Sequence, residues 1–178
     1  MDFKEFSSLV MSRQACRSFL PKLVEREKLQ QICDLARFSP SACNSQPWKM
    51  YCVSTKDKIE KVTESLQDNG YNRFLDNAGG YIVVGEVEAT LKASVSGKFD
   101  NNHFVKYDIG ELIAYITLCA KTLGLETCVI GYVNKDKLRL AIDMPENENC
   151  NLVVAVGYSD IAIREKSRKP FEQTVVEI

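Results

Sequence analysis

Residues 107–123 constrain the fold more strongly than any other part of this 178-residue chain. Apolar residues recur there at helical spacing and cover one broad face, namely Ile109, Leu112, Ile113, Ile116, Cys119, Ala120 and Leu123. Tyr115 and Leu118 widen this face, and Gly124 suits the end of the helix. Because so apolar a helix is normally central or buried in an interface, we expect one domain, residues 1–178, with its core around this helix.

The remaining elements follow from apolar spacing and β-propensity. Helical spacing predicts helices near the N-terminus, over residues 25–38, around residues 59–66 and over residues 135–142. Strands are expected at residues 48–54, 81–85, 127–130 and 152–158, with a β-rich tail at 174–178 that pairs away from the body of the domain. Residues 87–103 indicate an irregular or partly helical segment. This order is typical of the α+β class, a mixed α/β sandwich in which helices wrap a sheet.

Composition and missing motifs exclude several functions. The net charge of −1 gives no basic excess for nucleic acid, and no apolar run reaches the ~20 residues that a membrane helix needs. The N-terminus lacks the apolar block of a secretory signal, so we expect a cytoplasmic protein. Seven cysteines without a CxxC pair favour neither a disulfide framework nor a zinc site. With one histidine, no GxGxxG and no P-loop, the chain favours a bound organic cofactor or no catalysis.

The stretch SPSACNSQPW, residues 39–48, is unusually rich in hydrogen-bonding groups for a connector. Pro40 and Pro47 fix φ and remove two backbone donors, so this loop is expected to be stiff. A stiff polar loop is either a rigid turn or a wall that holds a ligand, and the loop alone does not distinguish the two.

Basic residues gather near both ends of the chain. Arg13 and Arg17 lie four residues apart, and Lys166, Arg168 and Lys169 lie within four residues. Arginine offers a planar fork that suits phosphate, and lysine offers a compact charge. The two clusters form a phosphate clamp if folding brings them together; otherwise they are two solvated surface patches.

Taken in order, the motifs resemble those of the nitroreductase family of flavoproteins over nearly the whole chain. They are SRQACRSF, SPSACNSQPW, NRFLDNAGGYIVV, DIGELIAYITLCAKTLGLETCVIGYV, LVVAVGYS and EKSRKPFEQTVVEI. The second of these is the most specific. The resemblance implies a nitroreductase-like fold with a central, mainly antiparallel sheet, and a homodimer with FMN at the subunit interface. It also suggests that the C-terminal strand is exchanged with the dimer partner.

The resemblance assigns cofactor contacts residue by residue. Arg13, Gln14, Ala15 and Arg17 match the motif that contacts the phosphate and the pyrimidine edge of the flavin, although the family usually has serine where Ala15 stands. The other matching positions are Asn72 at the ring or ribityl chain, Ile130 and Gly131 at the turn facing the flavin N5, Lys166 and Arg168 at the phosphate, and Pro40, Ser41, Ala42 and Asn44 in the loop from the partner subunit.

The activity implied is that of an FMN-dependent oxidoreductase. NADH or NADPH would transfer hydride to the flavin N5, and a small-molecule electron acceptor such as a nitroaromatic or a quinone would then take the electrons in a ping-pong cycle. No side chain is assigned a catalytic role. Three alternatives remain: a dehalogenase or flavin-destroying member of the same fold, a non-catalytic flavin-binding or redox-sensing protein, and a structural domain without flavin.

Overall fold

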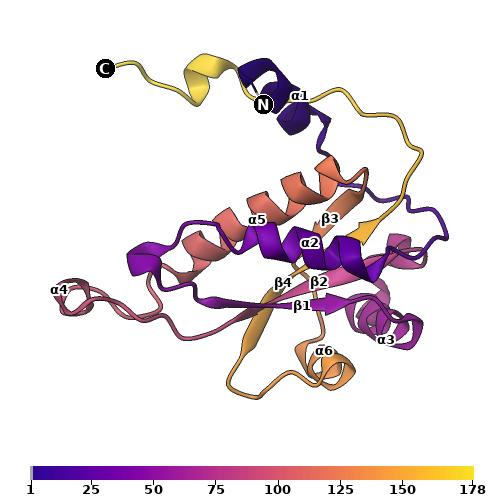
Figure 1. The fold of residues 1–178 in the computed structure, drawn as a ribbon, viewed down its shortest axis with the longest axis horizontal. Coiled ribbons are helices and arrows are strands. Elements are labelled where there is room, and N and C mark those ends of the chain that lie inside the picture. The colour runs from indigo at the N-terminus through magenta and orange to yellow at the C-terminus, as the bar shows by residue number, and fades with distance from the viewer. Residues whose placement is uncertain (1) are drawn as a thin grey trace.

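The structure is a computed structural model that describes residues 2–178 (Figure 1). Its helices are α1 (Phe3–Ser12), α2 (Arg26–Ala36), α3 (Lys56–Leu66), α4 (Ala93–Ser96), α5 (Val105–Thr122) and α6 (Lys135–Ile142). Its strands are β1 (Trp48–Val53), β2 (Gly80–Glu86), β3 (Glu126–Ile130) and β4 (Asn149–Gly157). Short 3-10 turns occupy Ala42–Asn44, Asp68–Gly70, Arg73–Leu75 and Phe171–Gln173. The expected helices and body strands are confirmed to within a few residues at each end.

The four strands form one antiparallel sheet in the order β1-β2-β4-β3. Strand β2 is buried on both faces, as its nearly all-apolar sequence predicts. Tyr81 and Val83 face the core that α3 and α6 cover, whereas Ile82 and Val84 face the core that α2 and α5 cover. The chain is therefore a helix-covered sheet with two cores, which confirms the expected mixed α/β sandwich.

Helix α5 supplies more residues to the second core than any other element. Ile109, Leu112, Ile116 and Ala120 are buried there, and Gly124 ends the helix in the left-handed region at φ +72°. Tyr107 and Tyr115 on the flanks of the same helix stay partly exposed. The central position expected from the sequence is confirmed.

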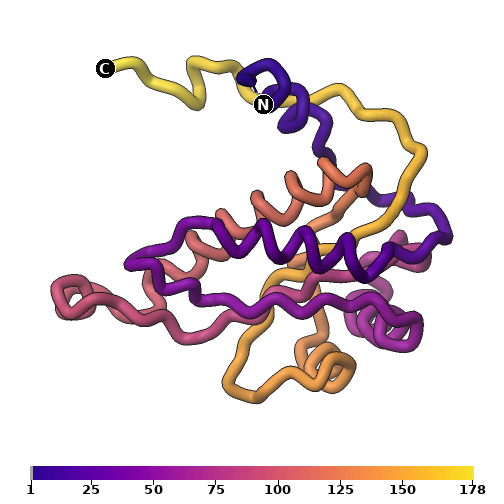
Figure 2. Tube along the Cα trace, in the orientation of Figure 1, coloured from indigo at the N-terminus to yellow at the C-terminus, as the bar shows by residue number. Residues whose placement is uncertain are grey.

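The two ends of the chain are packed least against the sheet. Figures 1 and 2 show α1 and the last residues close together on one side of the molecule, with the tail running away from the sheet. Helix α1 buries none of its residues, and Phe3 and Met11 remain 86% and 62% exposed. Residues 174–178 form no strand, so the strand expected in the tail is not present in this chain. No edge strand within residues 2–178 pairs with them, and strand propensity needs such a partner.

Replacing a core leucine of α5 should destabilise the protein far more than replacing a surface leucine. Leu112 is fully buried, so we expect Leu112→Ala to lower the free energy of unfolding by about 2–5 kcal/mol, since a cavity adds to the lost transfer energy. Leu140→Ala is the control, because Leu140 also lies in a helix but is 81% exposed. Urea unfolding at one protein concentration measures both, and similar losses would show that α5 is not central.

Candidate functional site

The segment from Arg13 to Arg17 lies along the outer edge of β3. The N–H of Cys16 donates to the carbonyl of Thr127 at 2.8 Å, and Ala15 forms a parallel bridge with the same threonine. Gln14 and Cys16 are buried, whereas Arg13 and Arg17 are not. The alternation of an extended chain therefore explains why the arginines lie at odd-numbered positions of this segment.

Gln14 joins this edge to the C-terminal segment. Its side-chain oxygen accepts from the backbone N–H of Arg164 at 3.1 Å, and its side-chain nitrogen donates to the carbonyl of Ala162 at 3.3 Å. Arg164 in turn donates to the carbonyl of Ala15 at 2.7 Å. Because both ends of the Gln14 amide bond the tail, its side chain has a structural role here, and the ligand contact expected of Gln14 stays a prediction.

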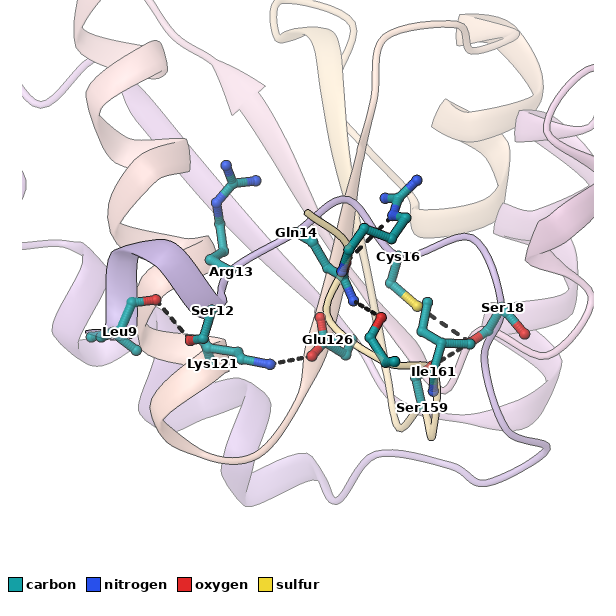
Figure 3. A network of polar contacts seen from close by, with 12 residues as sticks. Leu9, Ser12, Arg13, Gln14, Cys16, Ser18, Lys121, Glu126, Ser159 and Ile161 are labelled. Atoms are coloured by element: carbon teal, nitrogen blue, oxygen red, sulfur yellow. Dashed lines mark hydrogen bonds and ion pairs between the residues drawn. The ribbon is translucent and has the colours of Figure 1, made fainter. Parts of the chain in front are cut away.

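The basic residues from the two ends of the chain meet in one cavity. Lys166 donates to the carbonyl of Arg13 at 2.9 Å, and Arg168 lines the same space, a surface cavity of about 350 Å³. Figure 3 shows the Arg13 side chain pointing away from the nearby Lys121–Glu126 ion pair. The structure thus brings Arg13 of the first predicted cluster together with Lys166 and Arg168 of the second, whereas Arg17 and Lys169 do not line this cavity.

This cavity carries positive charge without a matching carboxylate. Within residues 2–178, Arg13, Arg164, Lys166 and Arg168 form no ion pair, although Glu165 also lines the cavity. Desolvation lowers the pKa of Lys166 below its usual value, and the neighbouring charges of Arg13, Arg168 and Arg164 lower it further. Like charges in this cluster contribute to lowering the pKa of Lys166, and a bound anion would offset their repulsion. Phosphate suits both the arginine and the lysine side chains.

A second group of predicted residues lies farther along the same edge. The guanidinium of Arg17 lies 5.9 Å from the ring centre of Phe74, two residues after Asn72. The side chain of Asn72 donates to the carbonyl of Leu66 at 2.8 Å and to that of Tyr132 at 3.4 Å, next to Gly131. Asn72 itself adopts the left-handed conformation at φ +50°.

Arg17, Asn72 and the end of β3 therefore form one neighbourhood. Ile130 is buried in the sheet and Gly131 is exposed beside it, so the chain leaves the core at this turn. An extended chain rises ~3.3 Å per residue, so the span from Arg13 to Arg17 is about 13 Å. The edge of β3 therefore has a cluster of cations at one end and polar and aromatic side chains at the other.

The loop of residues 39–47 is anchored elsewhere. The N–H of Ala42 donates to a side-chain oxygen of Asp108 at 3.1 Å, in the first turn of α5. The hydroxyl of Ser41 accepts from the N–H of Gln46 at 2.9 Å, which closes the loop on itself. Cys43, Asn44 and Gln46 all have φ between 49° and 56°, a strained conformation that clusters at functional sites.

Within one chain, this loop and the cation cavity lie at opposite ends of α5. Asp108 stands in the first turn, whereas Thr127 follows the last turn, and the 14 helical steps from residue 108 to residue 122 span roughly 21 Å. Pro40, Ser41, Ala42 and Asn44 therefore do not join Arg13 and Lys166 in the isolated chain. Their expected contact from a partner subunit stays a prediction.

Two residues of this region, Arg164 and Asp108, were not predicted from the sequence as site residues. Arg164 lines the cavity, and its signal was the alternate spacing of cations at 164, 166 and 168 in an extended segment. Asp108 is 5% exposed, and its second side-chain oxygen has no partner within the described residues. Its signal was an acid within the apolar face of the central helix.

The sequence and the fold of this chain are similar to those of known proteins. The family model described as "Nitroreductase family" matches residues 10–158. A chloronitrobenzene nitroreductase from Comamonas testosteroni is 23% identical over 92% of this chain and 92% of its own length. A nitroreductase family protein of Clostridium difficile 630 superposes with a TM-score of 0.78 at 26% identity, covering 99% of this chain and 98% of its own. An FMN-dependent nitroreductase of Clostridium difficile R20291 gives 0.67 at 25% identity, covering 93% and 92%.

These likenesses agree with the antiparallel sheet, the two helical layers and the order of the motifs along the chain. The matched residues include Arg13, Arg17, Asn72 and Gly131, and the family model spans well over half of the chain. The chain therefore belongs to the nitroreductase family, whose members are oxidoreductases.

Proposed function

We propose that this protein is an FMN-dependent NAD(P)H oxidoreductase that acts as a homodimer. The observation that carries the proposal is the unpaired cation cavity of Arg13, Lys166 and Arg168 on the edge of β3. A cofactor with a terminal phosphate and a polar ring system fits an edge that has cations at one end and Arg17 with Asn72 at the other. The FMN-dependent nitroreductase among the similar structures supports the same cofactor.

Each residue of the edge has a defined task in this proposal. Arg13, Lys166 and Arg168 bind the phosphate, and Ala15 leaves out the hydroxyl contact that a serine would add. Arg17 supplies positive charge near the ring, where charge develops on reduction. Bound FMN would supply the redox chemistry, taking hydride from NADH or NADPH and passing electrons to an acceptor. The chain itself contributes binding, orientation and electrostatics.

Homodimerisation is supported by what the single chain leaves uncovered. The apolar side chains of Phe3, Met11 and Val176 are 86%, 62% and 79% exposed, and they belong to α1 and the tail. A partner subunit would cover these residues and would bring residues 39–47 to the cation cavity. Within one chain the two halves of the site are separated by roughly 21 Å, as estimated from the helical rise. Contact across subunits would bring them together.

We further propose a flat aromatic electron acceptor, a nitroaromatic or a quinone. The printed name of the Comamonas testosteroni relative supports the nitroaromatic class. Within residues 88–104, Phe99, His103 and Phe104 form an aromatic cluster with ring centres 4.7–5.2 Å apart. This cluster could shape an acceptor pocket, since aromatic faces stack with flat rings.

Spectroscopy under anaerobic conditions tests the function directly. The purified protein should show flavin absorbance, and NADH or NADPH should bleach it, with the faster reductant defining the nicotinamide preference. A nitroaromatic or quinone added next should restore the bands. Flavin bands that neither nucleotide bleaches would instead favour the flavin-binding or sensing alternative. A protein that takes up no FMN would contradict the cofactor assignment.

The affinity for FMN should fall as the pH rises through the lowered pKa of Lys166. The phosphate would stabilise the lysine cation, so binding raises its pKa, and deprotonating the free site weakens binding above that pKa. Lys166→Arg should remove most of this slope on the side below the ordinary lysine pKa, because arginine keeps its charge. Fluorescence titration of the apoprotein measures both affinities.

Lys169→Arg is the matched control, because Lys169 lies in the same segment but does not line the cavity. It should keep the pH slope of the unaltered protein. An equal loss of slope in the Lys166 and Lys169 variants would place the titrating group elsewhere.

Mixed dimers test whether the two halves of the site come from different subunits. Arg13→Ala removes a cation, and a second variant, Asn44→Ala with Ser41→Ala, removes polar groups of the loop. If the site spans subunits, homodimers of either variant should bind FMN weakly, whereas a mixed dimer should regain one intact site in two. Titration of co-purified, differently tagged subunits measures this stoichiometry. Recovery of no site would show that cavity and loop belong to one chain.

A further inference from the structure

A pair of thiols lies outside the proposed cofactor site. Cys33 comes from α2 and Cys52 from β1, and their Sγ atoms are 3.3 Å apart. Neither is bonded in a disulfide, and sequence spacing gave no sign of the pair because 19 positions separate the two residues. Cys52 is exposed and Cys33 is half-buried behind it, so reagents reach Cys52 first.

Of the two thiols, Cys52 lines a surface cavity of about 470 Å³, which shares no lining residue with the cation cavity. Arg26 lines it from the first turn of α2, and Cys33 lies two turns later on the same side of that helix. Within residues 2–178 Arg26 forms no ion pair, whereas Lys58 in the same cavity pairs with Asp143 at 2.9 Å. An unpaired cation beside an exposed thiol is the setting of a reactive cysteine.

The hydrogen bond between the sulfurs shifts the pKa values of the two thiols in opposite directions. It lowers the pKa of the Cys52 thiol, and the charge of Arg26 adds to this effect. The same hydrogen bond raises the pKa of the Cys33 thiol, and burial raises it further. Of the two thiols, Cys52 therefore loses its proton more easily, and Cys33 can then donate to the Cys52 thiolate, which is the nucleophilic form of cysteine.

We propose that Cys52 and Cys33 form a redox-active pair, in which Cys52 reacts with a peroxide and Cys33 completes a disulfide. This inference does not depend on the flavin, the nicotinamide or the dimer. It assigns a modification site to the cavity between α2 and β1.

The chemistry balances with hydrogen peroxide as the oxidant. The Cys52 thiolate attacks one peroxide oxygen, the O–O bond breaks, and the released hydroxide takes a proton to become water. The Cys33 sulfur, losing its proton, then attacks the Cys52 sulfenic acid, the S–O bond breaks and a second water leaves. Two thiols and one peroxide give one disulfide and two waters, so sulfur is oxidised and oxygen reduced.

The disulfide would act on the loop of residues 39–47. Helix α2 ends at Ala36 and β1 begins at Trp48, so the two cysteines lie on the elements that flank this loop. A covalent bond between them fixes both ends of the loop relative to one another. Oxidation is therefore a means to change the mobility of a segment that carries three residues with positive φ.

Peroxide treatment followed by peptide mapping tests the proposal. The protein as purified, with its thiols reduced and the reductant then removed under argon, receives one equivalent of hydrogen peroxide and is then alkylated. It should lose two of its seven thiols and yield a peptide linked through Cys33 and Cys52. Absence of that linked peptide in the unaltered protein would overturn the proposal, whatever the variants do.

Three variants separate the roles. Cys33→Ser should leave a sulfenic acid on Cys52, which dimedone captures, and Cys52→Ser should lose no thiol on the same timescale. Cys43→Ser is the control, because Cys43 is partly exposed but has no thiol neighbour within the described residues, and it should still form the link. Dimedone labelling at Cys43 of the Cys33→Ser variant as fast as at Cys52 would contradict a selective site.

Discussion

The pairing of residues 13–17 with the edge of β3 is the contact on which the rest of the site depends. One backbone hydrogen bond to Thr127 sets the segment in place, and the buried amide of Gln14 then holds the C-terminal segment across it. Leaving a buried amide group unsatisfied costs about 1–3 kcal/mol. This cost favours keeping the C-terminal segment bound to Gln14. Arg13 and Lys166 are 153 positions apart in sequence, and they share a cavity because Gln14 and the bonds of Lys166 and Arg164 to backbone carbonyls hold the two segments together.

The cost of this arrangement is electrostatic. Four cations are held close together without an ion-pair partner in the described residues, and desolvation, with their mutual repulsion added to it, lowers the pKa of Lys166. The fold tolerates this because hydrogen bonds to backbone carbonyls of Arg13 and Ala15 fix Lys166 and Arg164. A site held ready in this way loses little further entropy when an anion enters, so its strain in the free protein favours binding.

Local sequence patterns predicted the helices and strands, but they did not predict the contacts between them. The periodicity of α5 and the all-apolar run of β2 each report burial of a single element, which is why both were predicted correctly. No local pattern reports that Gln14 bonds Arg164, or that Cys33 meets Cys52, because these contacts depend on how elements pack. The resemblance to a family supplied the link between the two basic clusters that periodicity lacked. The tail at 174–178 forms no strand within this chain, since its β-propensity has no strand here to pair with, and its exchange with a partner subunit stays a prediction.

Helix α5 links the two halves of the proposed site and keeps them apart. Its first turn holds the loop through Asp108, and the chain beyond its last turn holds the cation edge through Thr127. A loop with three non-glycine residues at positive φ persists only where its surroundings determine it, and here hydrogen bonds to the Asp108 carboxylate and to the hydroxyls of Ser41 and Ser45 contribute to this. Because a rigid helix cannot bring its own ends together, the proposed homodimer would join the loop of one copy to the cavity of the other. The apolar surface that the single chain leaves on α1 is then the place where such copies would meet.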